Sequence, residues 1–254
     1  MKSAARAIVL CASVTLPVAL VFGQGMTWDS KITSNGHEMV THTYYVPKKI
    51  KTVGDTSGDF TIIRIDQEKI YNVQTKDKTY SVMTFAELEQ MGKQMNAQME
   101  QVQKQMKDMP EEQRKMMEKM LGNKMPGAAD AKIEVSNTGE KKTISGFSCT
   151  KFVVKRDGKE ELTLWVTPDI KAFAAMRQDL TEQTKRMASM TPGGLKGIVE
   201  AMQKIEGFPI ETEMGTMMTS TVTKVEMKTV GASEFEVPAG YTKVDSKLLN
   251  KKPK

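Results

Sequence analysis

The chain has 254 residues and a formal net charge of +6, with 39% hydrophobic and 27% charged residues. This composition is typical of a soluble globular protein with a buried core, and it excludes a disordered chain and a polytopic membrane protein. Two Cys and two His exclude a disulfide scaffold and most zinc sites. The 21 Met outnumber Phe, Tyr and Trp together, so much of the apolar surface is soft and adaptable.

The first 23 residues predict a secretory signal peptide. Lys2 and Arg6 form a short positive head, and residues 7–22 form an apolar run. Gly23 then offers a small residue before a polar stretch, so we expect cleavage after Gly23. A membrane anchor is the alternative, but it needs about 20 strongly apolar residues, and this run is shorter and is interrupted by Pro17.

Cleavage would leave 35 basic and 31 acidic residues, a net charge of +4. Lys is interleaved with Asp and Glu along the chain, which is not the charge pattern of a nucleic-acid-binding protein. Only residues 246–254 form a locally basic tail, which we interpret as a solvated end, with membrane-surface contact as the alternative. Cys149 would be the only Cys of the mature chain, and we expect a small buried hydrophobe there.

Short runs rich in β-branched residues and Tyr predict an antiparallel meander in the first half of the mature chain. Asn35-Gly36 is a strong hairpin signal between the first two runs. A tight turn at 66–68 and another at 76–78 separate the later runs. We expect strands at 26–32, 40–46, 61–65, 70–73 and 79–82.

The period of the apolar pattern changes at Thr84. Thr84 and Glu87 form a capping box, with Met83 and Leu88 placed as a hydrophobic staple. The pattern predicts a helix over 85–107, about 34 Å long, and a second helix that starts near Pro110 and ends at Gly122. Apolar residues at spacings of three, four and seven form one stripe: Leu88, Met91, Met95, Met99, Val102, Met106, Met109, Met116 and Met120.

Strand patterns return in the second half and alternate with two further helices. Thr167-Pro168-Asp169 predicts the start of the third helix, with Pro at its first position. The apolar stripe of the third helix is Ile170, Phe173, Leu180, Met187 and Met190, and that of the fourth is Leu195, Ile198, Val199, Met202 and Ile205. We expect strands at 133–135, 143–154, 162–166, 208–213 and 218–230, and a closing segment at 235–244.

This order predicts an α+β fold: one antiparallel sheet with the helices against one face, in a single domain over 24–245. Several segments resemble a family of exported bacterial proteins catalogued only as a domain of unknown function: Ile63–Val73, Lys78–Tyr80, Gly139–Phe152, Leu164–Ile170 and Phe235–Tyr241.

The fold of that family is similar to the LolA-like lipoprotein carriers. The resemblance implies a curved antiparallel sheet, an open half-barrel, with helices packed on its concave face, in a periplasmic or envelope protein. The Met-rich helical insert over 85–125 departs from the plain pattern. That family has no known active site, so the resemblance implies no functional residue in this sequence.

No catalytic motif is present in the sequence. The segment His37-Glu38-Met39-Val40-Thr41-His42 is one residue too long for the zinc-protease motif, because histidines five apart diverge on a helix. No phosphate-binding loop, dinucleotide fingerprint or nucleophile motif occurs. We therefore expect a protein that is not an enzyme and has no cofactor.

The Met stripe allows three interpretations. It is core packing against the sheet, or it is a yielding groove for a lipid, an acyl chain or a lipoprotein, or it binds Cu(I) through the thioethers of Met91, Met95 and Met99. We favour hydrophobic ligand binding between the sheet and the Met-rich helices. Soft-metal binding and a structural envelope module are the alternatives. The expected ligand-binding residues are Met91, Met95, Met99, Val102, Met106, Met116 and Met120.

Overall fold

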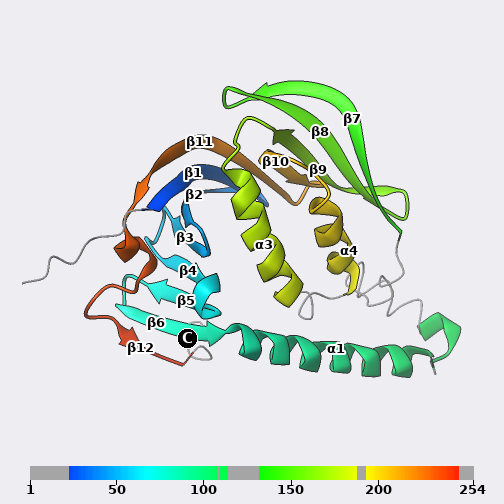
Figure 1. Cartoon of the computed structure of the whole chain (residues 1–254). Coiled ribbons are helices and arrows are strands. Elements are labelled where there is room, and N and C mark those ends of the chain that lie inside the picture. The colour runs from blue at the N-terminus through cyan, green and yellow to red at the C-terminus, as the bar shows by residue number, and fades with distance from the viewer. Residues whose placement is uncertain (1–22, 108, 114–131, 188–192, 246–254) are drawn as a thin grey trace, which may run out of the picture.

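The computed structural model describes residues 23–107, 109–113, 132–187 and 193–245 (Figure 1). The helices are α1 (Phe85–Lys107), α3 (Phe173–Met187) and α4 (Gly193–Met202), with 3₁₀ turns η1 (Ile65–Gln67) and η4 (Ala232–Phe235). The strands are β1 (Gly23–Ser34), β2 (His37–Val46), β3 (Lys49–Gly54), β4 (Phe60–Arg64), β5 (Lys69–Gln74), β6 (Thr79–Thr84), β7 (Ile133–Ile144), β8 (Phe147–Arg156), β9 (Lys159–Thr167), β10 (Phe208–Met214), β11 (Met218–Val230) and β12 (Thr242–Lys243).

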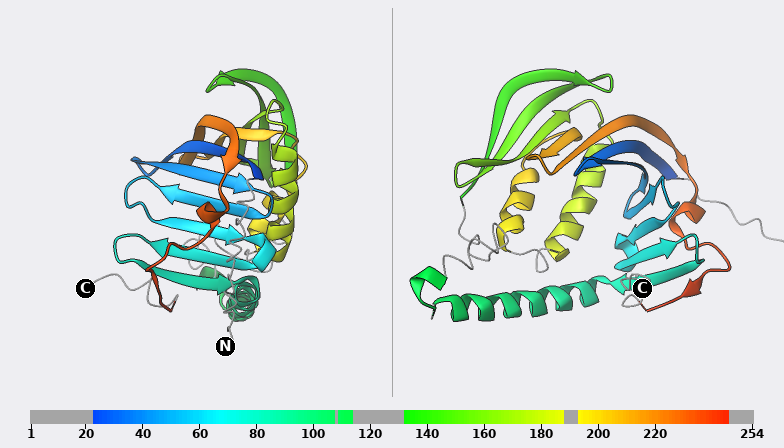
Figure 2. Two further views of the ribbon diagram at one scale, coloured as in Figure 1. Left: turned by 60° about the vertical axis from the view of Figure 1, so that its left-hand side comes forward. Right: turned by 180° about the vertical axis from the view of Figure 1, so that it is seen from behind.

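The twelve strands form one curved, unclosed sheet in the order β12-β6-β5-β4-β3-β2-β1-β11-β10-β9-β8-β7. Every neighbouring pair is antiparallel except β12 on β6. The sheet bends into an arch, and α3 and α4 lie inside it (Figure 1). Helix α1 continues from β6 and runs beneath α3 and α4 on the open side of the arch (Figure 2). The predicted α+β half-barrel is confirmed.

Local signals position several elements as predicted. The Asn35-Gly36 turn joins β1 to β2 with φ angles of 50° and 80°, the left-handed conformation that this dipeptide favours. At the start of α1, the backbone N–H of Glu87 donates to Thr84 Oγ1 at 3.1 Å, and that of Thr84 donates to Glu87 Oε2 at 2.7 Å. These bonds to Thr84 lower the pKa of Glu87. The capping box and the helix over 85–107 are confirmed, whereas the helix expected to end at Gly122 lies mostly outside the described residues.

The strand predictions differ from the structure in two places: one strand was missed, and one expected strand forms two. Strand β3 was not predicted, because its sequence KIKTVG is short and two lysines interrupt its apolar pattern. The expected strand over 143–154 is divided between β7 and β8 by a turn at Ser145 and Gly146, which have φ angles of 50° and 84°. Ser-Gly is a weaker turn signal than Asn-Gly or Asp-Gly, and the strand-forming residues next to it, Ile144 and Phe147, masked it.

The predicted start of α3 was also wrong. The helix begins at Phe173, not at Pro168. The Thr167 hydroxyl accepts the backbone N–H of Asp169 at 3.3 Å, which is a local turn rather than a helix cap. A separate turn over 170–173 then leads into the helix, with the N–H of Phe173 donating to the carbonyl of Ile170 at 3.1 Å.

Two separate clusters of buried apolar residues join the inner helices to the sheet. One joins strands β1, β2 and β3 to β10 and α3, with Met26, Ile50 and Met176 among its members. The other joins β8 and β9 to α4, with Leu164 and Ile198 among its members. Cys149 is fully buried, as predicted, and burial raises the pKa of its thiol.

Asp179 attaches α3 to the far half of the sheet. Its carboxylate is buried, with 8% of the residue exposed. Oδ2 accepts the Tyr45 hydroxyl at 2.9 Å and the backbone N–H of Lys48 at 2.6 Å. Burial and the bond to Asp179 raise the pKa of Tyr45, so the hydroxyl keeps the proton it donates. A helix that follows β9 is therefore bound to the β2–β3 turn.

We expect Asp179→Asn to lower the free energy of unfolding by about 2 kcal/mol, because it replaces hydrogen bonds to a buried charge with bonds to a neutral amide. Chemical denaturation measures the loss. Asp77→Asn, in the exposed turn between β5 and β6, is the matched control and should change stability by less than about 0.5 kcal/mol. Equal effects of the two substitutions would show that Asp179 does not anchor α3.

Candidate functional site

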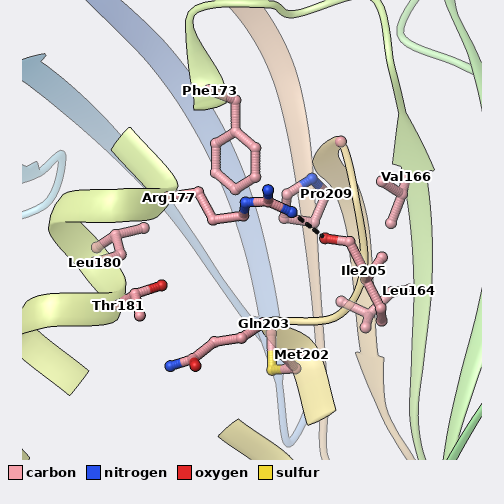
Figure 3. A pocket seen from close by; sticks show the side chains of 11 residues that line it. Leu164, Val166, Phe173, Arg177, Leu180, Thr181, Met202, Gln203, Ile205 and Pro209 are labelled. Atoms are coloured by element: carbon pink, nitrogen blue, oxygen red, sulfur yellow. Dashed lines mark hydrogen bonds between the residues drawn. The ribbon is translucent and has the colours of Figure 1, made fainter. Parts of the chain in front are cut away.

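An apolar pocket of about 260 Å³ lies between α3, α4 and the concave face of strands β9 and β10 (Figure 3). Its lining comes from β9, α3, the end of α4 and the segment that leads into β10. The lining residues are Leu164, Val166, Phe173, Arg177, Leu180, Thr181, Met202, Gln203, Ile205, Gly207 and Pro209.

The spacing of these residues along each strand or helix places their side chains on the side that faces the pocket. Leu164 and Val166 are two apart on β9 and so share one face of the sheet. The α3 residues at positions 173, 177, 180 and 181 are spaced by four, three and one, which places them on one side of the helix. Pro209 pairs with Val166 in the sheet register, so the start of β10 forms the adjoining wall.

The connection from α4 to β10 passes very close to β9 at Gly207. Its φ angle is +108°, and a Cβ there would lie 2.6 Å from the carbonyl oxygen of Thr167. Only glycine fits both the backbone conformation and the space. Gly207 therefore allows the segment with Ile205 and Pro209 to lie against β9 and complete the pocket wall.

Aromatic rings support the pocket on the side of the central strands. Phe173, which lines the pocket, meets Phe208 edge to face at 5.1 Å between ring centroids. Phe208 in turn meets Trp28 of β1 at 5.7 Å. These contacts hold the first turn of α3 against the middle of the sheet.

The polar side chains in the lining are Arg177, Thr181 and Gln203. The Arg177 guanidinium extends from α3 toward β10, and its Nη1 donates to the carbonyl oxygen of Ile205 at 3.3 Å (Figure 3). Thr181 lies one helical turn further along α3. The pocket is thus an apolar space with a cation and two neutral polar groups in its wall.

The expected ligand-binding residues whose side chains are described lie on α1, outside the pocket lining. Met91 and Met95 project from α1 with 53% and 41% of their surface exposed, and Val102 is half-buried. The side chains of Met99 and Met106, and the whole of Met116 and Met120, lie outside the described residues. Of the seven, only Met91, Met95 and Val102 have described side chains, and none of these three lines the pocket. The role of all seven in binding stays a prediction.

The pocket residues were only partly visible in the sequence. Phe173, Leu180, Met202 and Ile205 belong to the predicted apolar stripes of the third and fourth helices. The sequence feature that points toward the pocket is the presence of two amphipathic helices predicted to pack on one sheet. The sequence does not show that α3 and α4 leave a space between them, nor that Arg177 reaches into it.

No group of three or more His, Cys, Asp or Glu in the described parts of the chain is placed to hold a metal ion. Among the helices described, none combines the length and the apolar character needed to cross a bilayer.

The fold and the pocket define the class: a half-barrel α+β protein whose helices leave an apolar space on the concave face. Comparison of the sequence with known families then places it within that class. The chain belongs to the family described as Domain of unknown function (DUF4412), which matches residues 84–241. The family predicted from the sequence is confirmed. No curated protein matches the sequence.

Solved structures resemble the chain distantly. An uncharacterized conserved protein from Thermus thermophilus is 9% identical with a TM-score of 0.44, over 86% of this chain and 90% of that one. A chain of the MucA/MucB complex of Pseudomonas aeruginosa is 7% identical with a TM-score of 0.41, over 87% and 58%. PNGF-II is 12% identical with a TM-score of 0.38, over 89% and 32%.

We expect Gly207→Ala to lower the free energy of unfolding by about 3 kcal/mol, because it adds backbone strain to a clash with β9. Gly215→Ala is the matched control: its φ angle is +52° and its Cβ would meet nothing within 4 Å. The control should lose only about 1 kcal/mol. Thermal or chemical denaturation measures both, and similar losses would argue against close packing at Gly207.

Proposed function

We propose that this protein is a non-enzymatic binding protein that holds a hydrophobic ligand in the pocket between α3, α4 and the sheet. The observation that carries the proposal is the pocket itself, whose walls are mainly aliphatic and aromatic side chains from four separate segments. Concave, mostly apolar spaces with a few placed polar groups are the usual form of small-molecule sites.

The chemistry of the lining supports binding rather than catalysis. None of the eleven lining residues carries a carboxylate, an imidazole or a thiol. General acid–base or nucleophilic catalysis draws mostly on those groups. Among the described residues, Thr181 is the only hydroxyl in the lining, and the described lining holds no His or carboxylate to activate it.

The exposed methionines of α1 support a second, more mobile contact with the same kind of ligand. Met91 and Met95 lie one turn apart and are both exposed, although Met is a residue that favours burial. Flexible thioether side chains adapt to ligands of different shape. We propose that the stripe on α1 contacts the part of a long ligand that does not fit the pocket.

Displacement of an environment-sensitive apolar dye tests the proposal. We expect dye to bind the folded protein and octan-1-ol to displace it. Thr181→Trp should reduce dye binding at least tenfold, because an indole at this position occupies the pocket. Thr56→Trp, in the exposed turn between β3 and β4, is the matched control and should leave binding unchanged.

A double substitution separates the pocket from the stripe. Met91→Lys with Met95→Lys should change stability by less than about 0.5 kcal/mol, since both side chains are exposed. It should also leave dye binding within about twofold of the wild type. If Thr181→Trp has no effect and the double substitution abolishes dye binding, then the ligand site is on α1 and the pocket proposal fails.

We also propose that the protein is exported to the periplasm or secreted, on the basis of Lys2, Arg6 and the apolar run over 7–22. The N-terminus of the protein isolated from its own cells should begin at Gln24. Mass spectrometry of the intact mature protein measures this directly. Mature protein that retains Met1 would contradict export through a cleaved signal.

A further inference from the structure

We propose that the ligand of this pocket is an anionic amphiphile, a carboxylate with an apolar chain, whose head group is bound by Arg177. The inference rests on the proposed function and names the chemical class of the ligand. Three features of the site support it: the bonding of Arg177, the two neutral polar groups elsewhere in the lining, and the size of the apolar space.

Arg177 is a cation with unused hydrogen-bonding capacity. A guanidinium has five N–H donors, and the one hydrogen bond found for Arg177 is to the carbonyl oxygen of Ile205 at 3.3 Å. Within the described residues no carboxylate forms an ion pair with it. A charge at the edge of an apolar space is stabilised by an anionic partner, and the planar guanidinium matches a carboxylate in a two-bond arrangement.

Two neutral polar groups accompany the cation. Thr181 follows Arg177 by four residues, so both side chains lie on the same side of α3. Gln203 approaches from the segment after α4, on the opposite side of the pocket (Figure 3). A hydroxyl and an amide can each donate to a carboxylate oxygen, whereas the remaining side chains of the lining offer only apolar contact.

The volume limits how much of the apolar chain the pocket itself holds. A water molecule occupies about 30 Å³ of liquid, so a pocket of about 260 Å³ holds roughly nine groups of that size. A chain of about eight carbons therefore fits in the pocket, and the rest of a longer chain would extend out of it. Octanoate is therefore the appropriate probe, and octan-1-ol is its uncharged equivalent.

The test compares octanoate with octan-1-ol and octylamine by displacement of the apolar dye at neutral pH. We expect the wild type to bind octanoate at least tenfold more tightly than octan-1-ol, and octylamine most weakly. Arg177→Gln should reduce octanoate binding to the level of octan-1-ol and leave octan-1-ol binding unchanged. Arg177→Lys, which keeps the charge, should retain part of the preference.

Lys204→Gln is the matched control, because it removes one positive charge from an exposed position next to Gln203 in the chain. It should leave the preference for octanoate within about twofold of the wild type. A loss equal to that of Arg177→Gln would indicate general attraction of anions, and it would overturn the assignment to Arg177.

The outcomes separate this inference from the proposed function. If neither octanoate nor octan-1-ol displaces the dye, the proposed function fails. If octan-1-ol binds as tightly as octanoate, the function stands and the anionic assignment fails. The comparison of ligands on the wild type needs no variant, so it decides the question even if Arg177→Gln does not fold.

Discussion

The concave face of an unclosed sheet must be covered by other elements of the chain, and the rest of this structure depends on how the helices cover it. The outermost strands β7 and β12 do not pair with each other, so the sheet does not close on its own core as a barrel does. Its inner rows are apolar and would be exposed if nothing lay over them. Burial of such surface contributes about 25 cal/mol per Å², which makes it the main term that holds the helices inside the arch.

The two inner helices are held by different parts of the sheet. Helix α3 shares a core cluster with the central strands and is bound through Asp179 to the β2–β3 turn. Helix α4 packs on the β7–β9 side, where Gly197 lies so close to Ile133 that a Cβ would be 2.7 Å from its Cγ1. Because each helix follows its own half of a curved surface, the space between them is not filled by their side chains. The pocket is that space, and Arg177 of α3 reaches across it to Ile205.

Signals that act over a few residues predicted much of the fold. The Asn35-Gly36 turn, the capping box at Thr84 and the apolar period of α1 each depend on local chemistry, and each is found where the sequence places it. The errors occurred where a local pattern was weak or ambiguous. Lysines obscured β3, the Ser145-Gly146 turn was masked by its neighbours, and the Thr167 hydroxyl forms a turn rather than a cap.

The candidate site could not be predicted in the same way, because it depends on contacts between distant parts of the chain. Asp179 is 134 residues from Tyr45, and nothing in the sequence around either residue indicates the pairing. The apolar stripes of α3 and α4 predict that these helices pack on the sheet. A stripe does not show whether neighbouring helices leave a space between them. The Met stripe of α1 follows from the spacing of apolar residues in the sequence, but its exposure at Met91 and Met95 is a property of the tertiary arrangement.

The central claim is that an apolar ligand occupies the space between α3 and α4. Methyl NMR of protein labelled at the methionine Cε is the most direct test, since Met202 lines the pocket whereas Met91 and Met95 lie on α1. Octanoate is short enough to be contained in the pocket. On its addition, the Met202 resonance should shift progressively to saturation while those of Met91 and Met95 stay in place. Saturable shifts at Met91 and Met95 with Met202 unchanged would contradict the account.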